Sequence, residues 1–111
     1  MFSTALWEKL RREKFQEKEN RRKKILKQAK MDLARYFRNK RVSEVYLLGS
    51  ILEPGRFSDL SDIDIAVSNL GEDYFKTFSD LEEFFSTNID LIEMERCRFK
   101  ERIYSQGLKI V

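Results

Sequence analysis

The chain has 111 residues, which suits one domain with a single small core, and no apolar run approaches the ~20 residues of a membrane-spanning helix. The chain has one cysteine, Cys97, and no histidine, and this composition excludes intramolecular disulfides, Cys/His zinc sites and histidine general bases. Hydrophobic residues make up 41% of the chain and charged residues 37%, so we expect a globular fold with a heavily charged surface and, without a signal-peptide pattern, a cytoplasmic location.

The first predicted element is a long basic helix. From Leu6 to about Arg38 the chain has no Gly or Pro and is dense in good helix formers, and Ser3 or Thr4 suits the N-cap position. Residues 1–41 hold 15 Lys+Arg and 5 Asp+Glu, a balance of +10 within a chain of net charge +3. We therefore predict a basic N-terminal helical arm over residues 1–41.

The two halves of this helix differ in pattern. Apolar residues in the second half recur at helical spacing and form one face, which we expect to pack on the domain core. They are Leu26, Ala29, Leu33, Tyr36 and Phe37. The stretch from Arg11 to Lys24 is almost entirely charged, so we expect it to be a solvated extension or a handle for another chain.

Residues 42–111 form the second predicted unit, an acidic domain with 7 Lys+Arg and 14 Asp+Glu, a balance of −7. Runs of β-branched and aromatic residues predict strands at Val42–Leu48, Asp62–Val67 and Asn88–Met94, with Leu108–Val111 also extended. Helices are expected at Tyr74–Phe85, capped near Asp73, and at Phe99–Tyr104, ended by Gly107. One side of the first of these two helices is apolar: Phe75, Phe78, Leu81, Phe84 and Phe85. The pattern predicts an α/β (α+β) fold.

A pattern suited to phosphate binding follows the first strand. Gly49 ends that strand and lets the backbone approach a phosphate closely, and Ser50 opens a short turn that offers its hydroxyl and N–H groups to an anion. Pro54-Gly55 then marks a turn in the loop that leads to the second strand.

The second strand begins with a pair of carboxylates. Alternate side chains of a strand share a face, so Asp62 and Asp64 project together about 6.6 Å apart, while Ile63, Ile65 and Val67 point into the core. Two neighbouring carboxylates repel unless a cation lies between them, and a chain without histidine offers mainly oxygen ligands. The pair therefore indicates Mg²⁺, with Mn²⁺ as an alternative.

Asp90 lies among apolar residues of the third strand and is the candidate third ligand. Three carboxylates can bind two ions that activate the attacking oxygen and stabilise the leaving pyrophosphate, and Asp90 could also orient or deprotonate an acceptor hydroxyl. Each of these features alone is common on protein surfaces without any function. We interpret them as one site because they occur together in this order.

In these motifs the sequence resembles the polymerase-beta-type nucleotidyltransferases, and in its size it resembles their minimal members. The resemblance covers residues 42–107 and rests on the runs YLLGS, ending at Ser50, and LSDIDI, starting at Leu60, with a similar tail from Arg102 to Gly107. It implies a small mixed sheet flanked by helices.

The resemblance also implies roles for individual residues. Gly49 and Ser50 would bind the triphosphate, with Ser61 beside them, whereas Asp62, Asp64 and Asp90 would bind metal and form the catalytic site. Many members carry Arg-x-Arg-Gly after the Gly-Ser pair, but this chain has ILEPG, in which Glu53 has the opposite charge. Arg56, a basic residue of the arm or a residue of a partner would then supply the missing positive charge.

Minimal nucleotidyltransferases of this kind are often antitoxins of HEPN ribonucleases. The resemblance implies an antitoxin of a type VII-like system that acts as a protein adenylyltransferase, moving AMP from ATP to a tyrosine of the HEPN toxin by a two-metal mechanism. Two alternatives remain open: a non-catalytic antitoxin that masks the toxin, and nucleic-acid binding by the basic cluster at residues 21–24. Interleaved glutamates make direct nucleic-acid binding the less favoured of these readings.

Overall fold

The computed structural model describes residues 3–85 and 87–111. Its elements are α1 (Thr4–Phe37), β1 (Glu44–Leu48), η1 (Ser50–Leu52), β2 (Ile63–Ser68), α2 (Tyr74–Phe84), β3 (Ile89–Glu93), η2 (Met94–Arg96), α3 (Lys100–Gln106) and β4 (Leu108–Lys109). The predicted α/β class, the three main strands and the helices are confirmed. No helix in the described part of the chain combines the length and apolar composition needed to span a bilayer.

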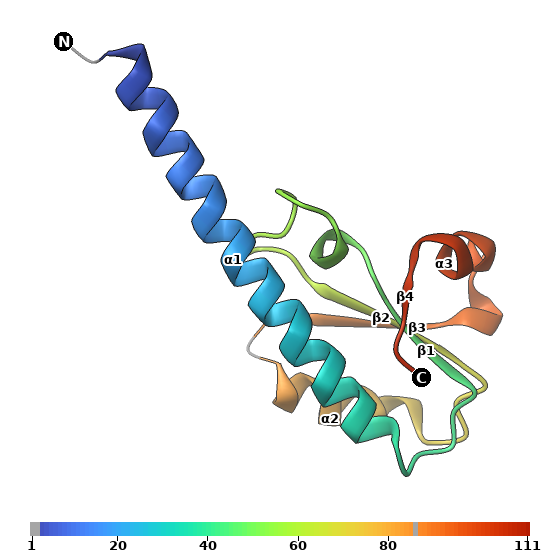
Figure 1. Ribbon diagram of the computed structural model, residues 1–111. Helices are drawn as coiled ribbons and strands as arrows, with labels where there is room; N and C mark the ends of the chain where they lie inside the picture. The colour runs from blue at the N-terminus through green and yellow to red at the C-terminus, as the bar shows by residue number, and fades with distance from the viewer. Residues whose placement is uncertain (1–2, 86) are drawn as a thin grey trace.

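The strands form a four-stranded mixed sheet in the order β3-β2-β1-β4 (Figure 1). β1 runs antiparallel to both β2 and β4, whereas β2 and β3 are parallel. Parallel neighbours need a crossover connection, which here contains α2. As a result, the start of β2, the start of β3 and the end of β1 lie at the same end of the sheet.

Each face of the sheet is covered by different helices. α1 and α2 cover one face, where the alternating residues Ile63, Ile65 and Val67 are fully buried, as the strand pattern predicted. On the other face, Ile103 of α3 and Met94 of η2 pack with side chains that include Tyr46 and Ala66. Asp64 of β2 and Asp90 of β3 belong to this second face, since they alternate with the core residues.

Helix α1 begins and packs as its sequence predicted. The Ser3 side chain accepts a hydrogen bond from the Leu6 N–H at 3.1 Å and so caps the helix. Ala29, Leu33 and Phe37 are buried in the core, while the first half of the helix projects beyond the domain (Figure 1). The molecule therefore measures 61 × 28 × 19 Å along its principal axes.

Two details differ from the expectations. The stretch Arg11–Lys24 is not solvated throughout, because Glu19 and Arg22 are buried, each with 6% exposure, against the loop after β1. In α2, Asp73 is the N-cap as predicted, but Phe75 and Phe84 are 78% and 50% exposed. The face of α2 that packs on the sheet centres on Leu81 and Thr77, and Phe75 lies on the side of the helix that points away from this face.

Candidate active site

The two strands that carry the predicted acidic residues lie side by side. Asp64 of β2 is paired in register with Asp90 of β3, and on its other side Asp64 is paired with Leu48, the last residue of β1. Asp62 precedes β2 by one residue and shares the face of Asp64. The structure thus brings the two acidic segments together next to the Gly49-Ser50 turn.

The electrostatics of this cluster centre on Asp64. Its side chain is half-buried, whereas Asp62 and Asp90 are exposed. Burial raises the pKa of the Asp64 carboxyl above its ordinary value, and the negative charges of Asp90 and Asp62 raise this pKa further. A cation beside the three carboxylates would relieve this repulsion.

The donor chemistry of the cluster suits a hard divalent cation, because all candidate ligands are carboxylate oxygens. In the described residues, however, no three His, Cys, Asp or Glu side chains already stand together in an arrangement that could hold a metal ion. Asp62, Asp64 and Asp90 would therefore need to turn toward a shared ion, and their role as ligands stays a prediction. Such ions would belong to the Mg²⁺ class.

Gly49 brings the backbone close to Asp64 in a conformation that favours glycine. Its φ of +85° lies in the region that side chains rarely adopt, and a Cβ at this position would overlap the Oδ2 atom of Asp64. Ser50 follows directly and opens η1, whose buried Ile51 fixes the turn in the core. The backbone at Gly49 therefore lies directly against the central carboxylate.

A cavity of about 330 Å³ opens beside this contact. Gly49 and Asp64 line it together with Arg102 of α3 and Glu53. Sequence reasoning did not assign a role to Arg102, although it begins the tail that resembles the family. Arg102 brings a positive charge to the side of the site where the Arg-x-Arg motif is missing.

The other predicted nucleotide-binding residues lie outside this cavity. Arg56 is exposed and forms an ion pair with Glu53, with 2.9 Å between Nη1 and Oε2. Ser61 lies in the loop before β2, where its Oγ accepts a hydrogen bond from the Ser58 N–H at 3.0 Å and its carbonyl accepts one from Thr87 Oγ1. The structure thus gives Ser61 a role in shaping the loop that leads to Asp62.

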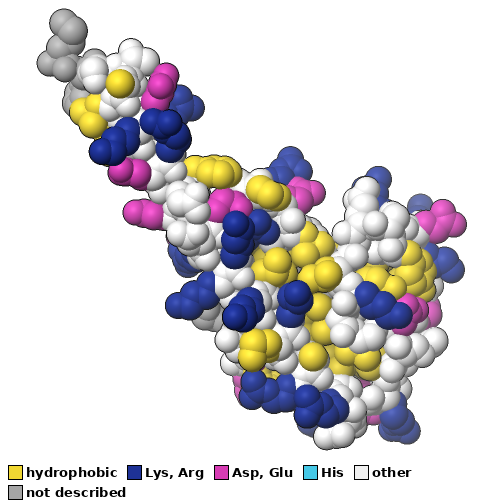
Figure 2. Space-filling view, in the orientation of Figure 1, with side chains coloured by type: hydrophobic (Ala, Val, Ile, Leu, Met, Phe, Trp, Pro, Cys, Tyr) yellow, Lys and Arg dark blue, Asp and Glu magenta, His cyan; other side chains and the backbone are white. Residues whose placement is uncertain are grey.

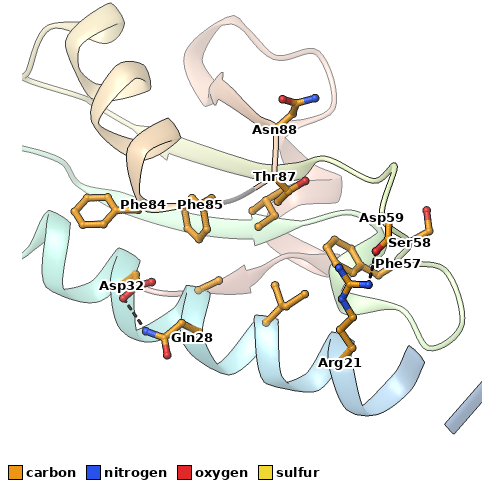
Figure 3. Close-up of a pocket in the computed structure, with 13 residues that line it drawn as sticks. Arg21, Gln28, Asp32, Phe57, Ser58, Asp59, Phe84, Phe85, Thr87 and Asn88 are labelled. Carbon is orange, nitrogen blue, oxygen red and sulfur yellow. Dashed lines mark hydrogen bonds and ion pairs between the residues drawn. The ribbon is translucent and has the colours of Figure 1, made fainter. Parts of the chain in front are cut away.

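A second cavity, of about 390 Å³, lies between α1 and the loops that precede β2 and β3 (Figure 3). Its walls include Phe57, Phe84 and Phe85, and Arg21 of α1 forms an ion pair with Asp59 beside it. None of the predicted site residues lines this cavity. It opens on the α1 side of the sheet, away from the face that carries the aspartates.

Comparison with known proteins gives a clear family match. The family described as Polymerase beta, Nucleotidyltransferase matches residues 31–111, which include all of the site segments and the last turns of α1. A comparison with curated proteins gave no match.

Solved structures with the same fold come from toxin–antitoxin complexes. A mutant MntA-HepT structure is 19% identical with a TM-score of 0.59, covering 74% of this chain and 71% of that chain. A toxin–antitoxin structure with AMP-PNP is 20% identical with a TM-score of 0.57, covering 76% and 72%. A further MntA-HepT structure is 19% identical with a TM-score of 0.51, covering 78% and 70%. At these identities the similarity establishes the shared fold.

Proposed function

The chain belongs to the polymerase beta nucleotidyltransferase family, and on that premise we propose that it is the antitoxin of a toxin–antitoxin pair, transferring AMP from ATP to a tyrosine of a HEPN ribonuclease toxin. The observation that carries the proposal is the in-register pairing of Asp64 with Asp90 next to Gly49. Nucleotide transfer needs negatively charged metal ligands and a close backbone approach to phosphate at one place, and this geometry supports both.

The proposed reaction is an in-line displacement at the α-phosphorus of ATP. The tyrosine oxygen of the partner forms a bond to this phosphorus, the bond to the pyrophosphate oxygen breaks, and Asp90 accepts the tyrosine proton. Bound divalent ions would neutralise charge on the triphosphate and favour the ionised acceptor oxygen. Asp62, Asp64 and Asp90 are the residues that would hold these ions.

Binding of the triphosphate is assigned to the Gly49-Ser50 turn and the cavity beside it. The glycine backbone at Gly49, which lines the cavity, leaves room for a phosphate, and the neighbouring Ser50 would offer its hydroxyl from outside the cavity. Arg102 is the cation of this site, since it lines the cavity with Gly49 and Asp64 whereas Arg56 is paired with Glu53. A guanidinium can bind phosphate oxygens with two parallel hydrogen bonds.

The partner is proposed from two observations. Solved structures that share the fold include MntA-HepT toxin–antitoxin complexes. In addition, the first half of α1 projects from the domain and exposes Leu6, Trp7 and Leu10 near its end. Basic side chains also line the arm in Figure 2. A projecting helix that exposes apolar side chains can insert them into a groove of a partner, which is a common recognition mode.

The proposal is tested by incubating the full chain with labelled ATP, Mg²⁺ and the helical protein encoded by the neighbouring gene. We expect label on a tyrosine of the partner, none in the presence of a chelator, and none with Asp62→Asn or Asp64→Asn. Asp59→Asn is the matched control, because Asp59 is an exposed aspartate of the preceding loop that pairs with Arg21. An unlabelled partner that nevertheless binds the chain would rule out transfer.

A second candidate is a non-catalytic antitoxin that masks the toxin. It is favoured by the pairing of Arg56 with Glu53 and by the absence, in the described residues, of an assembled three-ligand group. The two candidates differ in one result: a masking antitoxin carrying Asp64→Asn would still neutralise the toxin at equimolar concentration, whereas a transferase carrying it would not.

A further inference from the structure

Two buried charged residues connect α1 to the turn after β1. Glu19 and Arg22, each 6% exposed, lie one helical turn apart, and the guanidinium of Arg22 binds both carboxylate oxygens of Glu19, with Nη2 to Oε2 at 2.9 Å. Arg22 Nη1 also donates to the carbonyl of Ile51 at 2.9 Å, and Glu19 Oε1 accepts from the N–H of Gly55 at 2.6 Å. The pair therefore binds both ends of one short segment.

This segment is the continuation of the Gly49-Ser50 turn. It runs between two glycines with positive φ, Gly49 at +85° and Gly55 at +78°. Local backbone hydrogen bonds shape the turn itself, such as the one from the Glu53 N–H to the Ser50 carbonyl at 3.0 Å. Four further contacts hold the turn against the rest of the domain: the buried Ile51 side chain, the two hydrogen bonds from α1, and the ring of Phe15, which lies against Gly55. Three of these four tertiary contacts come from α1.

We propose that Glu19 and Arg22 are positioning residues for the nucleotide, which hold the Ser50–Gly55 segment, and through it Gly49-Ser50, in the geometry that binds the triphosphate. This inference rests on the proposed function. The two side chains form hydrogen bonds to backbone groups of the segment, at Ile51 and Gly55, so they would affect the nucleotide through this segment. Their arrangement also makes the arm part of the nucleotide site, because the same helix that projects toward a partner orients the phosphate turn.

A polar contact suits this place better than an apolar one. Residues 15, 19, 22, 26 and 29 follow helical spacing along one face of α1, and this face is apolar everywhere except at Glu19 and Arg22. Apolar side chains there would still cover the turn, but they could not bind the carbonyl of Ile51 or the N–H of Gly55. Because backbone hydrogen bonds fix both position and orientation, the pair specifies one conformation of the turn.

The test compares two full-length variants with the wild type. Arg22→Met alone leaves the Glu19 carboxylate buried and unpaired, which can unfold the chain, so the main variant is Glu19→Leu combined with Arg22→Met, which removes both charges. Arg21→Met is the matched control, since Arg21 is the neighbouring residue of α1 but forms an exposed ion pair with Asp59. The measurements are the thermal midpoint, hydrogen exchange at the Gly55 amide, the Kd for ATP with Mg²⁺, and KM and kcat for transfer.

We expect the double variant to fold, to exchange the Gly55 amide faster, and to bind ATP about tenfold more weakly, with KM rising by a similar factor and kcat at saturating ATP nearly unchanged. Arg21→Met should match the wild type in all four measurements. An unchanged Kd and KM for ATP in a folded double variant would overturn the positioning role while leaving the transferase proposal intact. A wild type that neither binds ATP nor transfers AMP would refute both.

Discussion

Asp64 holds its charge in an unfavourable environment. It is half-buried, two other carboxylates act on it, and both effects raise the pKa of its side chain. The wall opposite this carboxylate is the backbone of Gly49, so the protein offers it no positive partner there. Sites that favour an incoming cation commonly destabilise the empty protein in this way.

The consequence for stability can be measured by replacing Asp64 with Asn. The amide has nearly the same shape and removes the repulsion from Asp62 and Asp90, so the thermal midpoint without metal should rise relative to the wild type. Asp73→Asn is a useful comparison, because Asp73 caps α2 with an accepting oxygen that Asn retains. A fall in the midpoint for Asp64→Asn would show that this carboxylate stabilises the fold.

Arg102 is the residue whose replacement should weaken ATP binding most among the basic residues near the cavity. Under the proposed function, Arg102→Gln would remove a charge-assisted contact to phosphate worth about 1.5–3 kcal/mol, so KM for ATP should rise about 10- to 100-fold with the fold unchanged. Arg98→Gln is the control, since Arg98 precedes α3 but does not line this cavity. If Arg56→Gln raises KM and Arg102→Gln does not, the phosphate contact belongs to Arg56.

Glu19 should make the stability of the fold depend on pH in the acidic range. Hydrogen bonds from Arg22 and from the Gly55 backbone hold the pKa of Glu19 below its ordinary value of 4.5. Because the folded-state pKa is the lower one, the carboxylate contributes stability above the unfolded-state pKa, and this contribution is lost as pH falls through the folded-state value. Glu19→Gln should therefore flatten the decline of the thermal midpoint below about pH 4.5, whereas Glu17→Gln, on the exposed side of α1, should leave the wild-type slope.

At the level of elements, sequence patterns predicted most of the fold, because the spacing of apolar residues along a strand or helix shows which of its faces is buried. Alternation in β2 and helical spacing in α1 both report which face meets the core, and the structure buries those faces. The expectation failed for Phe75, because this aromatic side chain lies on the side of α2 that points away from the buried Thr77 and Leu81 and so faces solvent.

The candidate site was predictable only in part. Asp62, Asp64 and Asp90 stand out because carboxylates interrupt otherwise apolar strands, and the pairing of β2 with β3 brings Asp64 and Asp90 together. Arg102 and the pair Glu19–Arg22 gave no such signal. Each lies in a helix with several other charged residues. Only the tertiary packing of the helix shows which of these charged side chains faces the site.

Packing of the second half of α1 should account for much of the stability. Leu33 is fully buried in the core below the sheet, so Leu33→Ala should lower the free energy of unfolding by about 2–5 kcal/mol. Met31 lies on the outer side of the same helix with 52% exposure, and Met31→Ala should change stability by no more than about 0.5 kcal/mol. Urea unfolding followed by circular dichroism checks both values. Equal losses of unfolding free energy in the two variants would contradict the packing of the Leu33 face of α1 on the core.

At the level of the whole molecule, the end of the arm is separate from the folded core. Residues 4–14 are exposed and lie before Phe15, the first side chain of α1 that reaches the turn after β1. Deleting residues 1–14 should therefore leave the thermal midpoint and the Kd for ATP unchanged. If the arm docks on the proposed toxin partner, binding to it should weaken at least about tenfold, because the exposed Leu6, Trp7 and Leu10 are lost.

Calorimetric titration of the toxin with the shortened chain measures this effect. Replacing Leu6 and Leu10 together by Ser in the full-length chain is the complementary variant, since it keeps the helix length and removes exposed apolar area. Full toxin affinity in both variants would place the docking surface on the domain instead of the arm.

The projecting helix also governs how the molecule moves in solution. The radius of gyration of the whole molecule is 16.8 Å, whereas a compact chain of this length would have about 13 Å. A rod-like body rotates slowly about its short axes and sweeps out more solvent than its mass suggests, so a monomer will elute from a sizing column ahead of spherical standards of 13.4 kDa. Light scattering, which reports mass independently of shape, will separate this frictional effect from true association.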